Sequence, residues 1–214
     1  MDDCRHRLET YLLREGADLV GFTSAADFAS ALDGSAPSDL LKDARSVITI
    51  AVRVDAPPGT KKKRAMAEWR GKAFLLCELA FKASRLLFDE GYRALVVPPA
   101  TRSAYEALQG EISHKHAALK SGLGCIGKSS LLVTPEFGPR VALISIITDA
   151  DLGGGREFRE DLCGDCDICV QVCPVEDTVN EEERDGYYMI RKERCIKCYL
   201  CYTECPIGAG NTGH

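Results

Sequence analysis

"CGDCDICVQVCP" (residues 163–174) and "CIKCYLCYTECP" (residues 195–206) repeat one spacing of four cysteines followed by proline. Both stretches read C-x-x-C-x-x-C-x-x-x-C-P, so eight thiols stand in two identical frames. Three closely spaced cysteines on a loop can bind three irons of one cluster, while the fourth thiolate comes from elsewhere in the chain. The repeat therefore predicts a module that folds around two 4Fe–4S clusters.

The fourth ligand of each cluster is expected from the opposite frame, because paired frames of this spacing exchange their last cysteine. We assign one cluster to Cys163, Cys166, Cys169 and Cys205, and the other to Cys195, Cys198, Cys201 and Cys173. Structural zinc also accepts four thiolates, but it pairs two C-x-x-C knuckles and leaves the third cysteine and the C-P step without a role. The cysteines therefore favour a ferredoxin-like module that conducts single electrons.

Composition limits the remaining possibilities. The 214 residues carry a net charge of -5, so the chain lacks the basic excess that supports binding to nucleic-acid phosphates, and no nucleic acid is expected as a partner. The opening residues "MDDCRHRLETYLLREGADLVGF" contain acids and no long apolar run, so we expect neither a secretion signal nor a membrane anchor. A thiol-rich protein without an export signal favours metal or redox roles over disulfides, which predicts a cytoplasmic protein.

Helical and strand patterns are mixed ahead of the frames. Apolar residues recur at helical spacing through residues 61–90, including Leu76, Ala80, Leu87 and Phe88, and predict a long helix that covers a sheet. Strands are predicted at residues 17–25, 46–54 and 92–100, and two more within residues 130–150 around a turn at Pro135–Pro139. The order lacks strict alternation, so we predict an α+β domain at residues 1–152 and the double-cluster domain at residues 153–214. The stretch 151–161, "DLGGGREFRED", marks the boundary, because three successive glycines and clustered charges suit a mobile connection.

A second candidate site is the stretch "EISHKHAALKSGLGCIGKSS", residues 111–130. Its glycines allow tight turns or close approach to a flat ligand, and its cations and hydroxyls suit an anionic group. We take as candidate cofactor-binding residues Lys115, Gly122, Gly124, Cys125, Gly127, Lys128 and Ser129. Cys125 is either a packed thiol or a ligand contact. The frame is neither a Walker motif nor a dinucleotide fingerprint.

The stretch "HKHAALKSGLGCIGKSSLLVTPEFGPRVALISIITDA", followed by two C-P frames, resembles the epoxyqueuosine reductase family and, more distantly, the reductive dehalogenases. The resemblance covers roughly residues 94–206. It implies a nitroreductase-like core that holds a cobalamin, with the clusters delivering electrons to cobalt. The C-terminal helical repeats that help the family hold tRNA are not expected, because the sequence ends nine residues after Cys205. The resemblance therefore implies a short form of the family.

The resemblance also bears on proton donation. The family's proposed donor is an aspartate ahead of the glycine loop, and alignment on Ser121–Gly124 places Leu108 at that position. Glu111 or His114 would then take its place, and a histidine titrates near neutrality. We take Glu111 and His114 as the candidate catalytic residues.

Together these patterns predict an iron–sulfur oxidoreductase. It would relay single electrons through two 4Fe–4S clusters to a bound cobalamin or related corrinoid, which reduces or is activated toward a small substrate. A low-potential donor of the ferredoxin or flavodoxin type would supply the electrons. One alternative is a non-catalytic ferredoxin-like carrier that docks a partner enzyme, and another is a flavin-using reductase built on the same α+β core.

Overall fold

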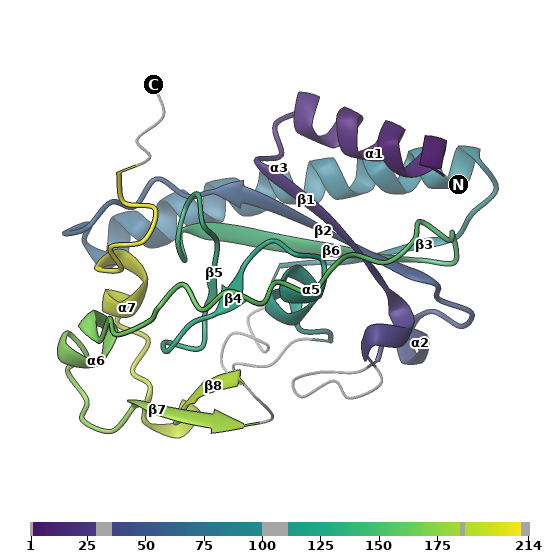
Figure 1. The fold of residues 1–214 in the computed structure, drawn as a ribbon. Helices are drawn as coiled ribbons and strands as arrows, with labels where there is room; N and C mark the ends of the chain where they lie inside the picture. Colours follow the sequence, from purple (N-terminus) through teal and green to yellow (C-terminus); the bar gives the residue numbers. More distant parts are fainter. Residues whose placement is uncertain (1, 29–35, 100–110, 185–186, 211–214) are drawn as a thin grey trace. The chain divides into compact units, whose positions relative to one another are not determined.

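The fold is that of a computed structural model, which describes residues 2–28, 36–99, 111–184 and 187–210 (Figure 1). Leu108, at the predicted aspartate position, lies outside the described residues. In chain order the elements are α1 (Asp2–Arg14), β1 (Leu19–Ser24), η1 (Ala25–Phe28), α2 (Pro37–Leu40), β2 (Ser46–Arg53), α3 (Lys62–Asp89), β3 (Ala94–Val97), α5 (His114–Lys120), β4 (Cys125–Ile126), β5 (Leu132–Val133), β6 (Val141–Thr148), α6 (Ile168–Gln171), β7 (Val179–Arg184), β8 (Tyr187–Ile190), η2 (Lys192–Arg194) and α7 (Leu200–Thr203).

Two compact units divide the chain, and each is assembled from three separate stretches. The sheet unit comprises Met1–Val52, Lys72–Leu123 and Ala142–Phe158. The cysteine unit comprises Arg53–Gly71, Gly124–Val141 and Arg159–His214. The division at residue 152 that the sequence suggests stays a prediction about folding domains.

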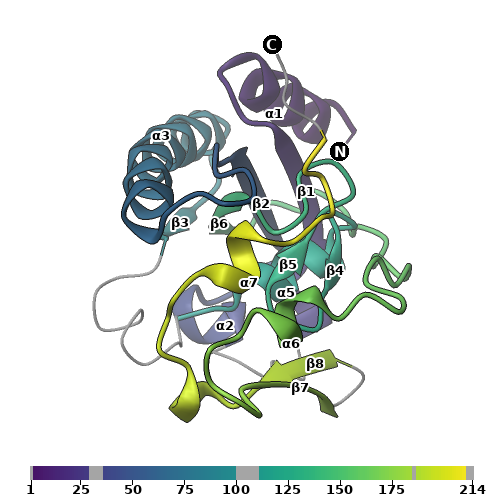
Figure 2. The same cartoon turned by 90° about the vertical axis from the view of Figure 1, so that its left-hand side faces the viewer.

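The sheet has the strand order β1-β2-β6-β3. β1 pairs antiparallel with β2, where Phe22 faces Ile48, and β3 pairs antiparallel with β6, where Val96 faces Ile146. Seven of the eight residues in β2 and in β6 are buried. Burial of consecutive residues requires cover on both faces of a strand, because side chains alternate between the faces. Figures 1 and 2 show this cover, with α1 and α3 on one face and α5 on the other.

The predicted long helix is α3. Leu76, Leu79 and Ala83 are 0% exposed and pack in the core. Phe88 was expected on the same face, and this expectation was wrong because Phe88 is 69% exposed. Successive helix residues are about 100° apart, so the buried Leu87 and its neighbour Phe88 cannot both face the sheet.

The glycine-rich stretch 151–155 is bound to the sheet unit instead of forming a free connection. The Leu152 backbone N–H donates a hydrogen bond to Ser46 Oγ at 3.0 Å. A side chain at Gly155 would come within 2.3 Å of the Phe22 carbonyl oxygen, so glycine permits this close approach. The glycines therefore serve packing as well as turning.

The cysteine unit contains two small antiparallel pairs, β4 with β5 and β7 with β8. The short helices α6 and α7, one from each cysteine frame, contact each other. Helices, a four-stranded sheet and a cysteine-rich module together confirm the α+β class. Among the described residues, no helix combines the length and apolar character needed to cross a bilayer.

Candidate iron–sulfur and cofactor site

The two cysteine frames fold alike. In each frame the third cysteine lies in a one-turn helix, Cys169 in α6 and Cys201 in α7. The Val172 N–H donates to Ile168 O at 2.9 Å, and the Glu204 N–H donates to Leu200 O at 2.8 Å. Each turn leads directly to the fourth cysteine of its frame. The repeated spacing therefore produces repeated local structure.

Electrostatic neighbours show which sulfurs lie together. Burial raises the pKa of Cys169 to about 11, and the nearby thiols of Cys163, Cys166 and Cys205 raise it further. Burial likewise raises the pKa of Cys201 to about 12, with added repulsion from Cys198, Cys169, Cys195 and Cys173. We call Cys163, Cys166, Cys169 and Cys205 the first cysteine site, and Cys195, Cys198, Cys201 and Cys173 the second cysteine site. This assignment keeps the prediction that the fourth cysteine of each site comes from the opposite frame.

The described thiols do not converge on single ion positions. Within residues 2–28, 36–99, 111–184 and 187–210, no three His, Cys, Asp or Glu side chains gather closely enough to hold one metal ion. A mononuclear zinc site needs four such convergent ligands, whereas a cubane takes one thiolate at each of its irons. The wider grouping fits the cluster.

Two buried hydroxyls in the cysteine unit also fit a bound cluster. Tyr202 follows Cys201 in α7 and is 7% exposed, and Thr178 is 3% exposed. In the described part of the chain neither hydroxyl finds a hydrogen-bond partner. A buried donor without a partner costs about 1–3 kcal/mol, and cluster sulfur is an acceptor that hydrogen bonds can reach. The residues of this unit therefore fit the two clusters that the sequence predicts.

Residues of the glycine loop lie against the first cysteine site. A side chain at Gly127 would meet Cys163 Sγ at 3.0 Å and Val133 Cγ2 at 2.7 Å. The Lys128 backbone N–H donates a hydrogen bond to Cys163, and the Lys128 charge lowers the pKa of that thiol, against the larger opposing effect of burial. Burial raises the pKa of Cys125, and the neighbouring Cys163 adds to this shift. This half of the loop thus belongs to the surroundings of a cysteine ligand.

The glycines of the loop have protein atoms as close neighbours. A side chain at Gly122 would lie 2.8 Å from the Arg156 carbonyl oxygen, and one at Gly124 would lie 2.2 Å from the Val133 carbonyl oxygen. The expected flat ligand is therefore not what requires glycine at these two positions.

The candidate cofactor residues divide between the units. Lys115 and Gly122 belong to the sheet unit, whereas Gly124, Cys125, Gly127, Lys128 and Ser129 belong to the cysteine unit. Lys128 and Ser129 are buried.

Arg140 is a cation that the sequence interpretation missed. It is 4% exposed, and its Nη1 donates to the Cys205 carbonyl oxygen at 2.7 Å, while its Nη2 donates to the Ile207 carbonyl oxygen. Its charge lowers the pKa of the Cys205 thiol, although burial raises that pKa more. The available signal was an arginine that opens the otherwise apolar strand "RVALISIIT".

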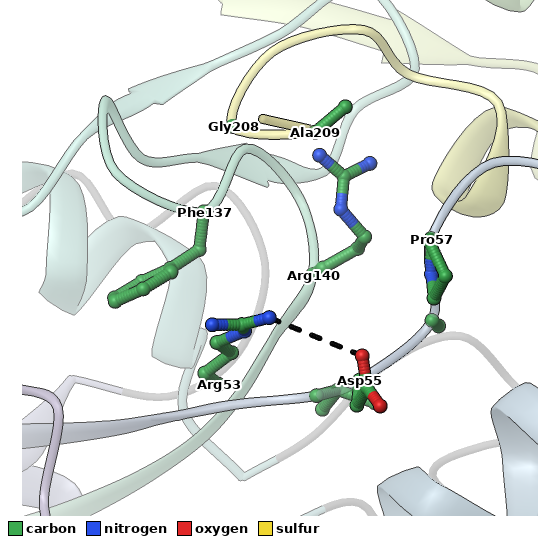
Figure 3. A pocket seen from close by; sticks show the side chains of 9 residues that line it. Arg53, Asp55, Pro57, Phe137, Arg140, Gly208 and Ala209 are labelled. Carbon is green, nitrogen blue, oxygen red and sulfur yellow. Dashed lines mark ion pairs between the residues drawn. The ribbon is translucent and has the colours of Figure 1, made fainter. Parts of the chain in front are cut away.

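Arg140 also lines a small, partly open pocket within the cysteine unit (Figure 3). Arg53 lines it as well, 3.9 Å from Asp55 and with its guanidinium carbon 6.0 Å from the centre of the Phe137 ring. The Arg53 charge and burial both lower the pKa of Arg140. Two arginines and the carboxylate of Asp55 therefore line the pocket.

His114 lies in the sheet unit with both ring nitrogens engaged. Nδ1 is 2.8 Å from Ser145 Oγ, and Nε2 is 3.1 Å from the Pro98 carbonyl oxygen. The carbonyl can only accept, so Nε2 carries the proton and the Ser145 hydroxyl donates to Nδ1. Burial lowers the pKa of His114 to about 4, so the ring is neutral near pH 7. Glu111, the other candidate catalytic residue, is exposed.

Residues 157–206 match the family described as "4Fe-4S dicluster domain". This match confirms the expected pair of 4Fe–4S clusters as the cofactors of the cysteine frames. The match covers less than a quarter of the 214 residues and is confined to the region of the frames.

Among curated proteins the chain is similar to the epoxyqueuosine reductase of Bacillus subtilis (strain 168), at 25% identity over 98% of this chain and 65% of that protein. It thus spans about two thirds of that relative's length. One similar solved structure is an epoxyqueuosine reductase with a tRNA-Tyr epoxyqueuosine-modified stem loop, with a TM-score of 0.73 at 21% identity over 99% of this chain and 67% of the other.

A second similar structure is a reductive dehalogenase described as suggesting a mechanism for B12-dependent dehalogenation. Its TM-score is 0.72 at 20% identity, over 95% of this chain and 31% of that chain. At such identities the structural likeness establishes the fold. Together with the curated relative, it confirms the resemblance to epoxyqueuosine reductases and reductive dehalogenases that the sequence motifs carry.

Proposed function

We propose that this chain, which resembles epoxyqueuosine reductases along nearly its whole length, is an iron–sulfur oxidoreductase that passes single electrons to a bound corrinoid. In this proposal the sheet unit is a nitroreductase-like core, and a low-potential donor of the ferredoxin or flavodoxin type supplies the electrons. The corrinoid would act on a small substrate. B12-dependent dehalogenation is the chemistry described for a reductive dehalogenase with a similar fold.

The observation that carries the proposal is the grouping of eight thiols into two cross-frame sites within one compact unit. Two 4Fe–4S clusters supply one-electron carriers whose potentials depend on charge, hydrogen bonds and exposure. Sharing of ligands between the frames keeps the two sites adjacent, since Cys169 and Cys201 are electrostatic neighbours. Short separation favours passage of electrons from one site to the other.

The chain's own residues would bind and tune these clusters. The eight thiolates hold the irons, and Arg140 fixes the backbone at Cys205 through its hydrogen bond to the carbonyl. The Lys128 backbone N–H donates to Cys163. In the sheet unit, neutral His114 keeps its proton at Nε2 in the hydrogen bond to the Pro98 carbonyl oxygen, and His114 and Glu111 remain the candidate catalytic residues.

The corrinoid part of the proposal rests on the relatives and not on the loop. Protein atoms lie where side chains would stand at Gly122, Gly124 and Gly127, so packing explains these glycines without a ligand. The candidates that remain for an anionic group of the cofactor are Lys115, Lys128 and Ser129.

Anaerobic reconstitution with iron and sulfide, followed by titration with cobalamin, tests the proposal. We expect stoichiometric binding, seen as a change in visible absorbance and in the cobalt EPR signal. The chain without clusters serves as the matched control for non-specific binding. Two intact clusters without any cobalamin binding would contradict the corrinoid proposal.

The second candidate function is a non-catalytic electron carrier, which the closed surroundings of the loop glycines favour. For this candidate the cobalamin titration gives no signal, while a ferredoxin or flavodoxin still reduces the clusters. Titration with flavin mononucleotide tests the alternative of a flavin-using reductase, for which stoichiometric flavin binding is expected.

The substrate class is a separate part of the proposal. A tRNA stem loop occupies one similar structure, although the net charge of -5 led us to expect no nucleic-acid partner. Fluorescence anisotropy with a labelled tRNA stem loop decides between these substrate classes. Binding that weakens steeply with salt would replace the small substrate in our proposal by RNA.

A further inference from the structure

The two cysteine sites have equal numbers of thiols but unequal charges around them. Lys128 and Arg140 are 6% and 4% exposed, and both lie beside ligands of the first cysteine site. Lys128 donates through its backbone N–H to Cys163, and Arg140 donates to the carbonyl oxygen of Cys205 at 2.7 Å. Two buried cations therefore flank the first site.

Arg140 has no carboxylate partner in the described part of the chain. Its hydrogen bonds go to the carbonyl oxygens of Cys205 and Ile207, which are neutral. A buried charge is costly unless an opposite charge compensates it. The thiolates of the first site, of which Cys205 is one, provide the nearest negative charge that the proposed function supplies.

The second cysteine site has a different environment. The groups that shift the pKa of Cys201 are burial and four neighbouring thiols, with no lysine or arginine among them. The second frame does include Lys197 and Arg194, but neither is buried, so water screens their charges. A buried charge at effective dielectric of about 20 acts about four times as strongly as one in water at the same distance.

Acidic residues near the first frame act in the opposite direction. Asp161 raises the pKa of Cys163, and Asp165 and Asp167 lie in the same frame. All three are exposed. By the same dielectric argument, the buried cations outweigh these solvated carboxylates.

We propose that Lys128 and Arg140 make the first cysteine site the one that holds the first electron added to the protein. The inference rests on the two-cluster function proposed above. An added electron increases the negative charge of a cluster, so a nearby buried cation stabilises the reduced form and raises the reduction potential. The two positioning residues would thereby give the relay a direction, from the second site toward the first.

A redox titration of the reconstituted chain, followed by EPR, tests this inference. Cys205→Ser and Cys195→Ser identify which signal belongs to which site. We expect the first site to have the higher midpoint potential. Arg140→Gln and Lys128→Gln should each lower that potential by about 59 mV, which corresponds to a tenfold change in the ratio of reduced to oxidised cluster for one electron.

Control variants separate charge from structure. Arg140→Lys keeps the charge and should retain most of the potential, while Lys197→Gln removes an incompletely buried cation and should leave both potentials nearly unchanged. A higher potential at the second site, or equal shifts at both sites, would overturn the inference. A chain that binds fewer than two clusters would instead overturn the proposed function, and iron analysis shows this separately.

An independent observation concerns the exposed face of α3. Phe74, Phe81 and Phe88 are 79%, 66% and 69% exposed and recur every seven residues. The opposite face of the same helix is buried through Leu76, Leu79 and other residues of the core. We call the three phenylalanines the aromatic stripe. A helix that is apolar on two faces has a second surface to cover.

We infer that the aromatic stripe pairs with the same stripe of a second copy of this chain, antiparallel about Phe81. A seven-residue repeat is the spacing at which two helices keep one seam in contact. Two-fold pairing brings residues before Phe81 beside residues after it, so Glu78 of one copy approaches Arg85 of the other. Parallel pairing would place like charges together.

The charge pattern supports this choice of partner. Glu78 and Arg85 now form exposed pairs within the helix, with Lys82 at 2.8 Å and Asp89 at 3.2 Å respectively. Exposed pairs of this kind contribute little, so they can be exchanged across an interface. Each phenylalanine offers roughly 150–250 Å² for burial, which suits a modest, concentration-dependent dimer.

Sedimentation velocity over a range of concentrations measures the association. We expect a reversible dimer that Phe81→Glu dissociates by at least about tenfold in the dissociation constant, with Leu13→Glu as an exposed-leucine control outside the stripe. Glu78→Arg should weaken the dimer, and Glu78→Arg combined with Arg85→Glu should restore it. A monomer at all concentrations, or a dimer unchanged by Phe81→Glu, would overturn the inference.

Discussion

Substitution of Gly138 by alanine tests how the turn at residues 135–139 supports the first cysteine site. Gly138 has a φ of +58°, and a Cβ there would lie 2.1 Å from the Ile207 carbonyl oxygen and 3.2 Å from Arg140 Nη2. The obstructing atom is backbone, so it cannot rotate away. The substitution therefore affects both the turn and the contact that Arg140 makes beside Cys205.

The cost follows from two separate effects. A left-handed conformation costs a residue with a Cβ about 1–2 kcal/mol, and forcing extra volume into a packed region costs about 1–3 kcal/mol. Together they destabilise the chain by about 2–5 kcal/mol. For a protein of this size each kcal/mol lowers the melting temperature by about 2–4 °C. We also expect loss of iron from the first site, because Cys205 moves with its carbonyl group.

Two glycines provide matched controls. Gly59 has a φ of +82° with nothing within 4 Å of its Cβ position, so Gly59→Ala measures the conformational cost alone. Gly154 has an equally open Cβ position without a positive φ, so Gly154→Ala should have almost no effect. Melting of the reconstituted proteins and iron analysis provide the comparison. If Gly138→Ala has the same melting temperature as Gly59→Ala and retains all its iron, the turn at residues 135–139 does not support Cys205 and the reasoning is refuted.

Three further predictions concern other parts of the chain. Cys173→Ser should remove the EPR signal of the second cysteine site and spare the first, and retention of both signals would refute the exchange of ligands between frames. His114→Gln should reduce the loss of stability on acidification. The folded chain holds the His114 ring neutral with a pKa of about 4, so the stabilisation of up to about 3 kcal/mol is lost as the pH falls from about 6.5 toward 4. Equal urea midpoints for the variant and the wild type at each pH would contradict this. Gly71 lies at an exposed position of α3, and no atom lies within 4 Å of the place where a Cβ would stand. Gly71→Ala should therefore raise the free energy of unfolding by up to about 1 kcal/mol. A lower melting temperature would show that the helix is not continuous there.

Most of the regular structure followed from local patterns. The runs of β-branched residues at 46–54 and 141–148 became the buried strands β2 and β6, because continuous apolar side chains require cover on both faces. The equal cysteine spacing of the two frames corresponds to the equal one-turn helices α6 and α7. The small strand β4 and the β7–β8 hairpin were missed, since the residues of β7 are mostly charged and show no apolar alternation.

The candidate site was harder to predict because its key contacts join distant residues. Arg140 lies 65 residues before Cys205 in the chain, and only the fold brings its guanidinium to that carbonyl. Gly124 and Gly127 were predicted to contact a cofactor, but side chains there would meet Val133 and Cys163, so packing alone already requires glycine. A glycine pattern shows that something lies close to the backbone and does not show whether it is ligand or protein.

Anaerobic reconstitution with quantitation of iron and sulfide, combined with EPR of the reduced chain, tests the central claim most directly. The account predicts about eight irons and eight sulfides per chain, together with signals from two cubane clusters close enough to interact. Tight binding of zinc at two sites, with no stable cluster formed, would contradict it.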